Sequence, residues 1–302
     1  MKQSLPRIAF LMQCHKNPKQ VSLLINSLNK LYNCCFFLHI DKKSAEIRDQ
    51  ICTENVSLLP IDSAVDVQWG KFSQCEATFQ LIQAALSSGQ EFDYLWLISG
   101  QDIPICSAES ANRILSDCSV PYIHVEGAGT PLYKALAKRN DIPYLDLMLE
   151  RTTKARIIRS LWKMLSGGKQ YTFPLFRRKL DIPYYFGSSW WCLPCNCVKE
   201  MIELYCSSTK YKKYFSRSAN PDESLFQTLF MQTSYAGSQQ GILVYTDWSS
   251  CSASPKTFTN ADFSSIKENG TRYMLARKFD FSVDSQVIYR VLDELCGLPV
   301  EL

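Results

Sequence analysis

The sequence predicts an α/β fold with a mostly parallel central sheet, because apolar runs alternate with amphipathic stretches through residues 1–126. The runs "RIAFLMQ", "CCFFLHID" and "FDYLWLIS" lack polar alternation, which is typical of parallel strands buried on both faces. Between them, "PKQVSLLINSLNKLY" and "FSQCEATFQLIQAALSSG" carry apolar residues at helical spacing. In such a Rossmann-like sheet, ligands bind at the carboxyl ends of the strands.

The rest of the chain continues with less regular elements. We predict a helix at 108–117, a strand at 121–126, and then an irregular basic insert at 127–182 that contains one amphipathic helix. A strand at 184–194, a helix at 197–208, a helix that begins after Asn220 and a last helix at 285–297 follow. No linker separates two parts, so residues 1–302 are predicted to form one domain with sections 1–126, 127–182 and 183–302.

The charge of the chain is concentrated in the insert. The formal net charge is +4, but residues 134–179 hold 12 Lys and Arg against 3 Asp and Glu, a balance of +9. The total is too small to indicate a nucleic-acid partner, whereas the insert suits an anionic one. The stretch "RTTKARIIRSLWKML" is typical of a basic amphipathic helix, which either contacts an anionic membrane or packs its apolar side on the domain.

Targeting signals and disulfide patterns are not recognisable in the sequence. No apolar stretch reaches 18 residues, and the 13 cysteines are odd in number and irregularly spaced, which favours free thiols in a reducing compartment. We therefore predict a cytoplasmic protein, peripheral at the inner face of the membrane if the basic insert binds lipid. Cys192, Cys195 and Cys197 hint at zinc, but no second Cys/His pair matches them, so no metal is predicted.

Polar residues follow the predicted strands where a nucleotide would bind. His39 and Asp41 lie in "HIDKKS", and Asp102 lies in "SGQDIP". No glycine-rich phosphate loop is present, so a dinucleotide or an ATP cradle is excluded, and a nucleotide held by its base and ribose is the alternative. An Asp after a strand is also commonly a turn or cap residue.

The stretch "NPDESLF" is typical of a helix start. Asn220 suits the cap position, Pro221 the first helical position, and Glu223 is spaced to close a capping box. The same acid could instead act as a general base, and Asp222 could orient a substrate hydroxyl, although a role at the helix start is the preferred interpretation.

Tryptophans offer surfaces for stacking on a sugar. Strand alternation sends Trp190 and Trp191 to opposite faces, so at most one of them lines a site. Trp69 and Trp248 either stack on a sugar or fill the core, and the core is the preferred interpretation for any single tryptophan.

Six motifs occur in one order along the chain: "QWGKFS", "LISGQDIP", "FGSSWWCLP", "NPDESLFQT", "YTDW…SPKTFT" and "ARKFD". Together they resemble the Core-2/I-branching family of β-1,6-N-acetylglucosaminyltransferases (glycosyltransferase family 14) and its peptide xylosyltransferase relatives, particularly the shorter bacterial members. The resemblance implies a GT-A-like fold, an inverting mechanism, a UDP-sugar donor and catalysis without a metal or another cofactor. Many sugar-nucleotide transferases hold a divalent metal with an Asp-x-Asp pair. The stretch "GQDIP" has a single acid at this place, which agrees with catalysis without a metal.

Site residues are carried over from the family by position. The catalytic base falls on Glu223. Donor-binding residues fall on the following: His39, Asp41, Asp102, Lys256, Arg277 and Lys278. Acceptor-binding residues are expected at Trp190, Asp222 and Trp248. The insert, where a glycan or lipid-linked glycan acceptor should bind, matches the family poorly. Transfer of N-acetylglucosamine into a bacterial surface polysaccharide is therefore weighed against xylosyl or other hexosyl transfer, a non-catalytic sugar-nucleotide or glycan-binding protein, and a hydrolase using Asp222 and Glu223.

Overall fold

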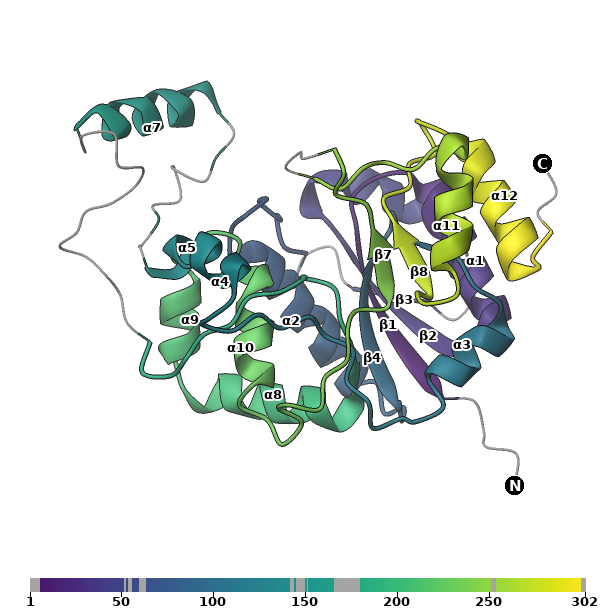
Figure 1. The fold of residues 1–302 in the computed structure, drawn as a ribbon, viewed down its shortest axis with the longest axis horizontal. Helices are drawn as coiled ribbons and strands as arrows, with labels where there is room; N and C mark the ends of the chain where they lie inside the picture. Colours follow the sequence, from purple (N-terminus) through teal and green to yellow (C-terminus); the bar gives the residue numbers. More distant parts are fainter. Residues whose placement is uncertain are drawn as a thin grey trace.

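The structure is a computed structural model that describes residues 6–51, 53, 56–59, 64–141, 144, 150, 152–165, 180–250 and 254–299. Within these ranges the central sheet has the strand order β3–β2–β1–β4–β6 (Figure 1). Its strands are β1 (Arg7–Cys14), β2 (Asn33–Ile40), β3 (Val56–Leu58), β4 (Tyr94–Ser99) and β6 (Cys192–Pro194). The first four are parallel and β6 is antiparallel to β4, which confirms the predicted fold class.

Helices cover both faces of the sheet because β1 alternates between two apolar cores. Ile8, Phe10 and Met12 pack with α1 (Pro18–Leu31) and α12 (Ser285–Cys296) on one face. Ala9 and Leu11 pack on the other face with α2 (Ser73–Leu86), α8 (Cys195–Ser207) and α10 (Leu225–Phe230). The strand order reverses between β1 and β4, so the crevice where a doubly wound sheet binds ligands opens between their carboxyl ends.

A second, three-stranded sheet brings the C-terminal part of the chain to that crevice. Its order is β5 (Ile103–Pro104), β8 (Leu275–Arg277) and β7 (Val244–Thr246), with β7 and β8 parallel. Because β5 follows β4 after a turn at 100–102, β8 is carried beside the carboxyl end of β4.

The remaining described helices connect these layers. They are α3 (Ala108–Ile114), α4 (Pro131–Leu136), α5 (Lys138–Asp141), α7 (Thr153–Leu165), α9 (Lys210–Phe215) and α11 (Phe263–Asn269), with 3₁₀ turns at Lys42–Gln50, Pro221–Glu223 and Asn260–Asp262. Helix α7 stands away from the body of the molecule (Figure 1). No described helix is long and apolar enough to cross a membrane.

One predicted strand is wrong and another is confirmed only in part. Residues 121–126 form isolated bridges, from Tyr122 to Cys192 and to Gln240 and from Glu126 to Phe186, and the strand predicted at 184–194 is reduced to β6. Between Phe186 and Cys192 the backbone leaves the sheet, and the Gly187 N–H donates to the Glu223 carbonyl at 2.9 Å. The chain from Gly187 to Trp190 is therefore available to connect other elements.

Candidate active site

Arg277 ends β8 and lies over the carboxyl end of β4. Its Nε is 3.3 Å from Oδ1 of Asp102, and Asp102 is fully buried. The Asp102 carboxylate also accepts bonds from the Ser99 N–H at 2.8 Å and the Ser99 hydroxyl at 3.0 Å. Burial raises the pKa of Asp102, and the positive charge of Arg277 opposes that shift. Asp102 thus holds Arg277 in place, while its predicted contact with a nucleotide stays a prediction.

The other side of Arg277 lies on an aromatic ring. Its guanidinium carbon is 4.1 Å from the ring centroid of Trp190, a cation–π contact in a largely buried setting. Trp191 has 1% exposure and belongs to the core beside α2, α8 and α10, whereas Trp190 is partly buried and packs against both cores, so the prediction that the two tryptophans face opposite ways stays a prediction. The role predicted for Trp190 in acceptor binding stays a prediction, since the structure shows it supporting a cation.

Lys278 follows Arg277 and is half buried. Burial lowers the pKa of Lys278, with Arg277 and Lys16 adding to the effect, so this ammonium lies in a strongly positive neighbourhood. The bound diphosphate of a nucleotide would favour its charged form. The predicted contact of both cations with the donor stays a prediction.

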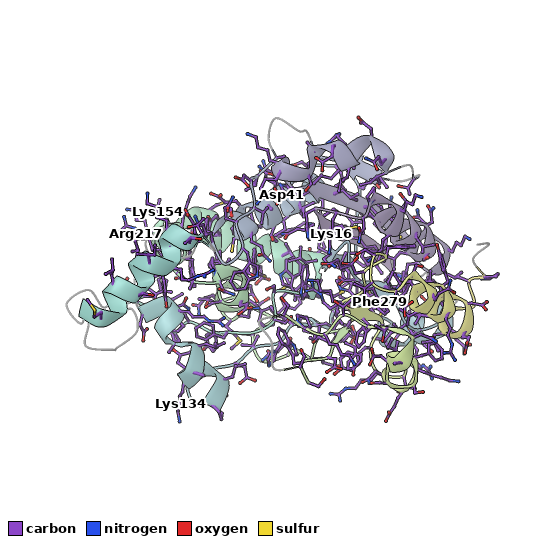
Figure 2. The ribbon with its side chains drawn as sticks, turned by 90° about the horizontal axis from the view of Figure 1, so that it is seen from above. Lys16, Asp41, Lys134, Lys154, Arg217 and Phe279 are labelled. Atoms are coloured by element: carbon purple, nitrogen blue, oxygen red, sulfur yellow. The ribbon has the colours of Figure 1, made fainter. Side chains whose placement is uncertain are left out.

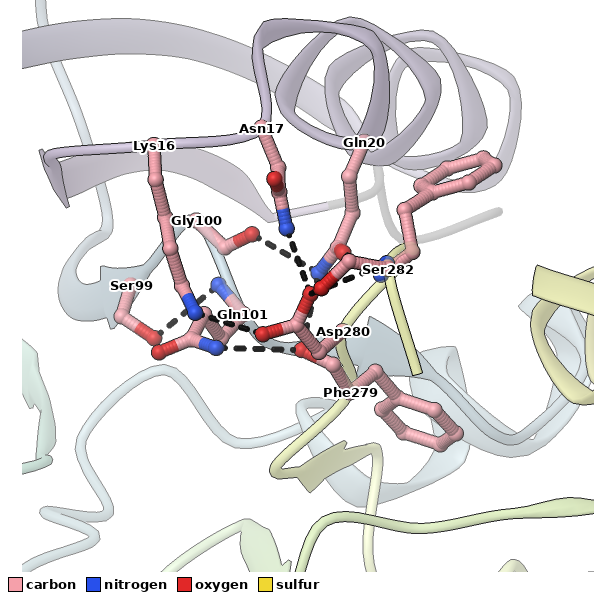
Figure 3. A network of polar contacts seen from close by, with 10 residues as sticks. Lys16, Asn17, Gln20, Ser99, Gly100, Gln101, Phe279, Asp280 and Ser282 are labelled. Atoms are coloured by element: carbon pink, nitrogen blue, oxygen red, sulfur yellow. Dashed lines mark hydrogen bonds and ion pairs between the residues drawn. The ribbon is translucent and has the colours of Figure 1, made fainter. Parts of the chain in front are cut away.

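The segment after Lys278 is fastened to the end of β1. Asp280 accepts bonds from Lys16 Nζ at 2.5 Å and Asn17 Nδ2 at 2.8 Å, and from the hydroxyl of Ser282 at 2.6 Å (Figure 3). These bonds lower the pKa of Asp280, so its carboxylate stays ionised and the ion pair persists. The chain "CHKN" after β1 therefore has a structural role in positioning the cations.

Gln20 reinforces the same junction from helix α1. Its side chain is fully buried and donates to the carbonyls of Gly100 at 3.0 Å and Phe279 at 3.2 Å, while its oxygen accepts from the Phe281 N–H at 2.8 Å. Gln101 adds a bond from its Nε2 to the Phe279 carbonyl at 3.3 Å. The turn after β4 and the chain after β8 thus share one buried set of partners.

His39 and Asp41 lie at the end of β2, as expected for residues at the edge of a ligand crevice. His39 is buried, its pKa is lowered by that burial, and its Nε2 accepts from the Val65 N–H at 2.9 Å. Asp41 accepts from the Lys43 N–H at 3.1 Å and its own N–H donates to the Cys14 carbonyl at 2.9 Å. Both residues therefore shape the loop at this edge, and their contact with a nucleotide stays a prediction.

Lys256 and Trp248 border the same region from the chain after β7. The Lys278 N–H donates to the Lys256 carbonyl at 3.4 Å, and the Lys256 ammonium pairs with Asp262 at 2.5 Å. Trp248 is 54% exposed and comes two residues after Thr246, the register partner of Arg277. Its ring is therefore accessible to a sugar.

The turn from Asn220 to Ser224, here called the acidic turn, does not have the predicted cap. Asn220 has φ 50° and ψ 56°, its side chain caps no backbone group, and its N–H donates to the Gly70 carbonyl at 2.9 Å. Pro221 begins a 3₁₀ turn as predicted, but the carboxylate of Glu223 pairs with Nη1 of Arg139. The capping-box interpretation is therefore wrong. Asn220 has a left-handed backbone and its side chain makes no cap hydrogen bond, while the carboxylate of Glu223 forms an ion pair with the guanidinium of Arg139.

Asp222 is buried beside Glu223. Its carboxylate accepts from the Ser189 hydroxyl at 2.6 Å. Burial and then the charge of Glu223 raise the pKa of Asp222 to about 6, with Ser189 and Arg139 opposing. Asp222 is thus held inside the acidic turn, and its predicted contact with an acceptor stays a prediction.

The segment from Gly187 to Trp190, here called the bridging segment, connects the acidic turn to Arg277. The Gly187 N–H donates a hydrogen bond to the carbonyl of Glu223, and the Ser189 hydroxyl donates one to the carboxylate of Asp222. The ring of Trp190 stacks on the guanidinium of Arg277. A Cβ on Gly187 would lie 1.8 Å from the carbonyl oxygen of His124, so only glycine fits. One short segment therefore contacts the acidic turn, through the backbone of Glu223 and the carboxylate of Asp222, and also the guanidinium of Arg277.

The family model of the Core-2/I-branching enzyme matches residues 8–274 of the chain. The chain belongs to this family. It is therefore a glycosyltransferase, which confirms the family and the enzyme class inferred from the six motifs. A comparison with curated proteins found no match.

Solved structures give weaker similarities. The galactosyltransferase LgtC, solved with donor and acceptor sugar analogues, is 12% identical, with 90% of this chain and 86% of that one covered at a TM-score of 0.36. The bifunctional glycosyltransferase WbbM is 12% identical. The match covers 92% of this chain and 46% of WbbM, at a TM-score of 0.38. Mouse xyloside xylosyltransferase 1 is 11% identical. The match covers 89% of this chain and 97% of the mouse protein, at a TM-score of 0.35. The family assignment depends on the family model alone.

Sequence reasoning missed Arg139, Ser189 and Gln20. Arg139 lies in the insert that matches the family poorly, and one arginine among many basic residues carries no signal. Ser189 lies inside the "FGSSWW" motif, whose polar residues could have indicated a partner for a nearby acid. Within the described ranges, no group of three His, Cys, Asp or Glu could hold a metal, and the described cysteines are free thiols.

Proposed function

We propose that this family member is an inverting glycosyltransferase that uses a UDP-sugar, with N-acetylglucosamine as the donor sugar, and works without a metal. Glu223 takes the proton of the acceptor hydroxyl as the hydroxyl oxygen bonds to the anomeric carbon. The bond to the diphosphate breaks on the opposite face, and UDP leaves with the electron pair. The product has a β linkage.

The bridging segment is the observation that carries this proposal. It connects Glu223, at the surface of the acidic turn, to Arg277, whose guanidinium is fixed between Asp102 and Trp190. A general base and a preorganised cation are the two parts that an inverting displacement needs, and the bridging segment contacts the residues proposed for both. A general base contributes roughly 10²- to 10⁴-fold to the rate.

The cations support departure of the diphosphate without a metal. Asp102, the single acid after β4, is fully buried and pairs with Arg277. Arg277, Lys278 and Lys256 would then carry the charge of UDP, Arg as a planar fork and Lys as point charges. The pairing of Lys256 with Asp262 implies that this lysine exchanges partners when the donor binds.

A donor screen tests the reaction. Release of UDP by the purified protein is measured from UDP-N-acetylglucosamine, UDP-xylose, UDP-glucose and UDP-galactose, with EDTA and a panel of glycan acceptors. Release from UDP-N-acetylglucosamine that is unchanged by EDTA is expected, with a β-linked product by NMR. Full dependence on Mn²⁺ contradicts the cationic site, and preference for UDP-xylose or another hexose identifies the alternative donors. UDP binding without turnover identifies a non-catalytic binding protein.

The acceptor is proposed to be a surface polysaccharide precursor, and helix α7 is proposed to bind anionic lipid next to it. Along α7, Ile157, Leu161 and Met164 are 55%, 51% and 73% exposed at helical spacing, and Lys154 and Arg156 are exposed beside them. An exposed apolar stripe with flanking cations complements an anionic membrane surface. Lys134 and Lys154 lie toward the same end of the molecule, away from Phe279 (Figure 2).

Co-sedimentation with vesicles tests the membrane contact. Vesicles with 30% phosphatidylserine are compared with pure phosphatidylcholine for the parent and for a variant with Arg151, Lys154 and Arg156 all changed to Gln. The parent is expected to sediment only with the anionic vesicles, and the variant with neither. A variant with Lys199, Lys267 and Arg272 all changed to Gln removes three exposed charges away from α7, and this matched control should behave like the parent. Binding unchanged by the triple substitution refutes the proposal.

A further inference from the structure

The Glu223 carboxylate is joined to the insert by a contact that no motif of the sequence indicates. Arg139, on α5, pairs through Nη1 with Oε2 of Glu223, and the two side chains are 32% and 31% exposed. Taking Glu223 as the base of the proposed reaction, we propose that Arg139 is the positioning residue that aims this carboxylate at the acceptor hydroxyl.

Buried bonds hold the backbone of Arg139 against the acidic turn. The Ala219 N–H donates to the Arg139 carbonyl at 3.0 Å. Next to it, the fully buried side chain of Asn140 donates to the Ser224 hydroxyl at 2.7 Å, and that hydroxyl donates to the Tyr185 carbonyl at 2.7 Å. These bonds flank the acidic turn on both sides and do not involve the side chain of Arg139. The guanidinium is therefore presented from a fixed backbone, and its replacement leaves the junction itself in place.

The neighbouring acid explains why a cation is needed here. Asp222 and Glu223 are adjacent, and the pKa of Asp222 is raised first by burial and then by the negative charge of Glu223. Without a cation the Glu223 side chain would turn away from Asp222 toward solvent. Arg139 is close enough to act on both acids, since its charge opposes the shift at Asp222 while its side chain bonds Glu223.

The pairing leaves the proton transfer feasible. Arg139 contacts Oε2 of Glu223, and a carboxylate needs one oxygen to accept a proton, so Oε1 can take it while Oε2 keeps its orientation. The acceptor O–H bond breaks toward Oε1 as the acceptor oxygen bonds to the anomeric carbon and UDP departs. Once Glu223 is neutral, the charge of Asp222 remains as the counter-charge of Arg139.

Three substitutions test the role of Arg139. Arg139→Gln removes the charge, Arg139→Lys keeps the charge without the fork, and Lys199→Gln on α8 is a matched charge loss at an exposed position outside the insert. Initial rates give kcat and KM for donor and acceptor, UDP affinity is measured by calorimetry, and thermal melts check folding. Each Arg139 variant is also made in a Glu223→Gln background.

A loss of kcat for Arg139→Gln is expected, roughly tenfold to a hundredfold, as part of what a general base contributes. The KM values and UDP affinity should change less than about twofold, Arg139→Lys should recover part of kcat, and Lys199→Gln should match the parent. In the Glu223→Gln background, Arg139→Gln should cause no further loss, because two residues that act as one unit are not additive.

Three results overturn the inference. Parent-like kcat in Arg139→Gln, or an equal loss in both backgrounds, means that Arg139 does not act through Glu223. A raised acceptor KM with unchanged kcat means that Arg139 only binds the acceptor. The proposed function fails separately: if Glu223→Gln itself turns over normally, Glu223 is not the base, whatever Arg139 does.

Discussion

Replacing Asp222 by Asn tests the electrostatics of the acidic turn through the pH dependence of stability. In the folded protein, burial and Glu223 raise the pKa of Asp222 from 3.8 to about 6. The folded state therefore binds more protons than the unfolded chain between these values. Stabilisation from this proton is fully present below pH 3.8 and is lost as the pH rises through 6, so the group destabilises the fold near neutrality.

The magnitude follows from the difference between the two pKa values. One pKa unit corresponds to about 1.4 kcal/mol, so about two units amount to about 3 kcal/mol over the full range. Between pH 4.5 and pH 7.5 the expected loss is about 2 kcal/mol. Asp222→Asn removes this loss and keeps an acceptor for the Ser189 hydroxyl. Relative to the parent, the variant should thus gain about 2 kcal/mol on going from pH 4.5 to pH 7.5.

Urea unfolding followed by tryptophan fluorescence at the two pH values measures this gain. Asp117→Asn is the control, because Asp117 is exposed, its pKa is lowered by Ser119, and it is ionised at both pH values. Its stability relative to the parent should be the same at pH 4.5 and pH 7.5. If Asp222→Asn and the parent lose stability in parallel over this range, Asp222 is not a buried acid with a raised pKa, and the charge argument for Arg139 loses its basis.

Three further predictions concern the parts that hold the site. Arg277→Gln should lower kcat/KM by roughly 10²-fold, measured by UDP release, because one preorganised donor to the leaving group is lost; a loss below threefold would show that UDP leaves without this cation. Gln20→Leu should lower the free energy of unfolding by about 1–3 kcal/mol in urea titrations, because buried backbone groups lose their partner; unchanged stability would mean that water replaces the side chain. Gly187→Ala should abolish activity and lower the melting temperature, since its Cβ cannot avoid the His124 carbonyl; wild-type rates would show that the bridging segment can move without consequence.

The regular elements were predictable wherever local pattern decides structure. Apolar runs over β1, β2 and β4 and the apolar stripe of α1 and α2 predicted the parallel sheet, because burial of a strand on both faces leaves a continuous hydrophobic run. The strand predicted at 121–126 failed, because its sequence suits a strand but its hydrogen-bond partners separate at the bridging segment. Pairing depends on the partner as well as on propensity.

The sequence indicated Glu223 and Arg277 as candidate site residues, but it did not indicate the contacts that connect them. Glu223 and Arg277 were selected by motif resemblance, and the structure connects both to the bridging segment. The cap at Asn220 was predicted from residue types alone, and a bond to the Gly70 carbonyl, 150 positions away in sequence, gives that residue a left-handed backbone instead. Arg139 had no signal, since its partner is 84 residues distant.

By itself the sequence determined the fold class, the family and the residue types available for chemistry, because hydrophobic period and motif order are properties of the chain read in one dimension. Only the tertiary structure decided which carboxylate is buried with a raised pKa and which is paired at the surface, that Asp102 holds Arg277, and that the insert delivers Arg139 to the acidic turn. These outcomes depend on desolvation and on distances between atoms far apart in sequence, and both quantities exist only once the chain has folded.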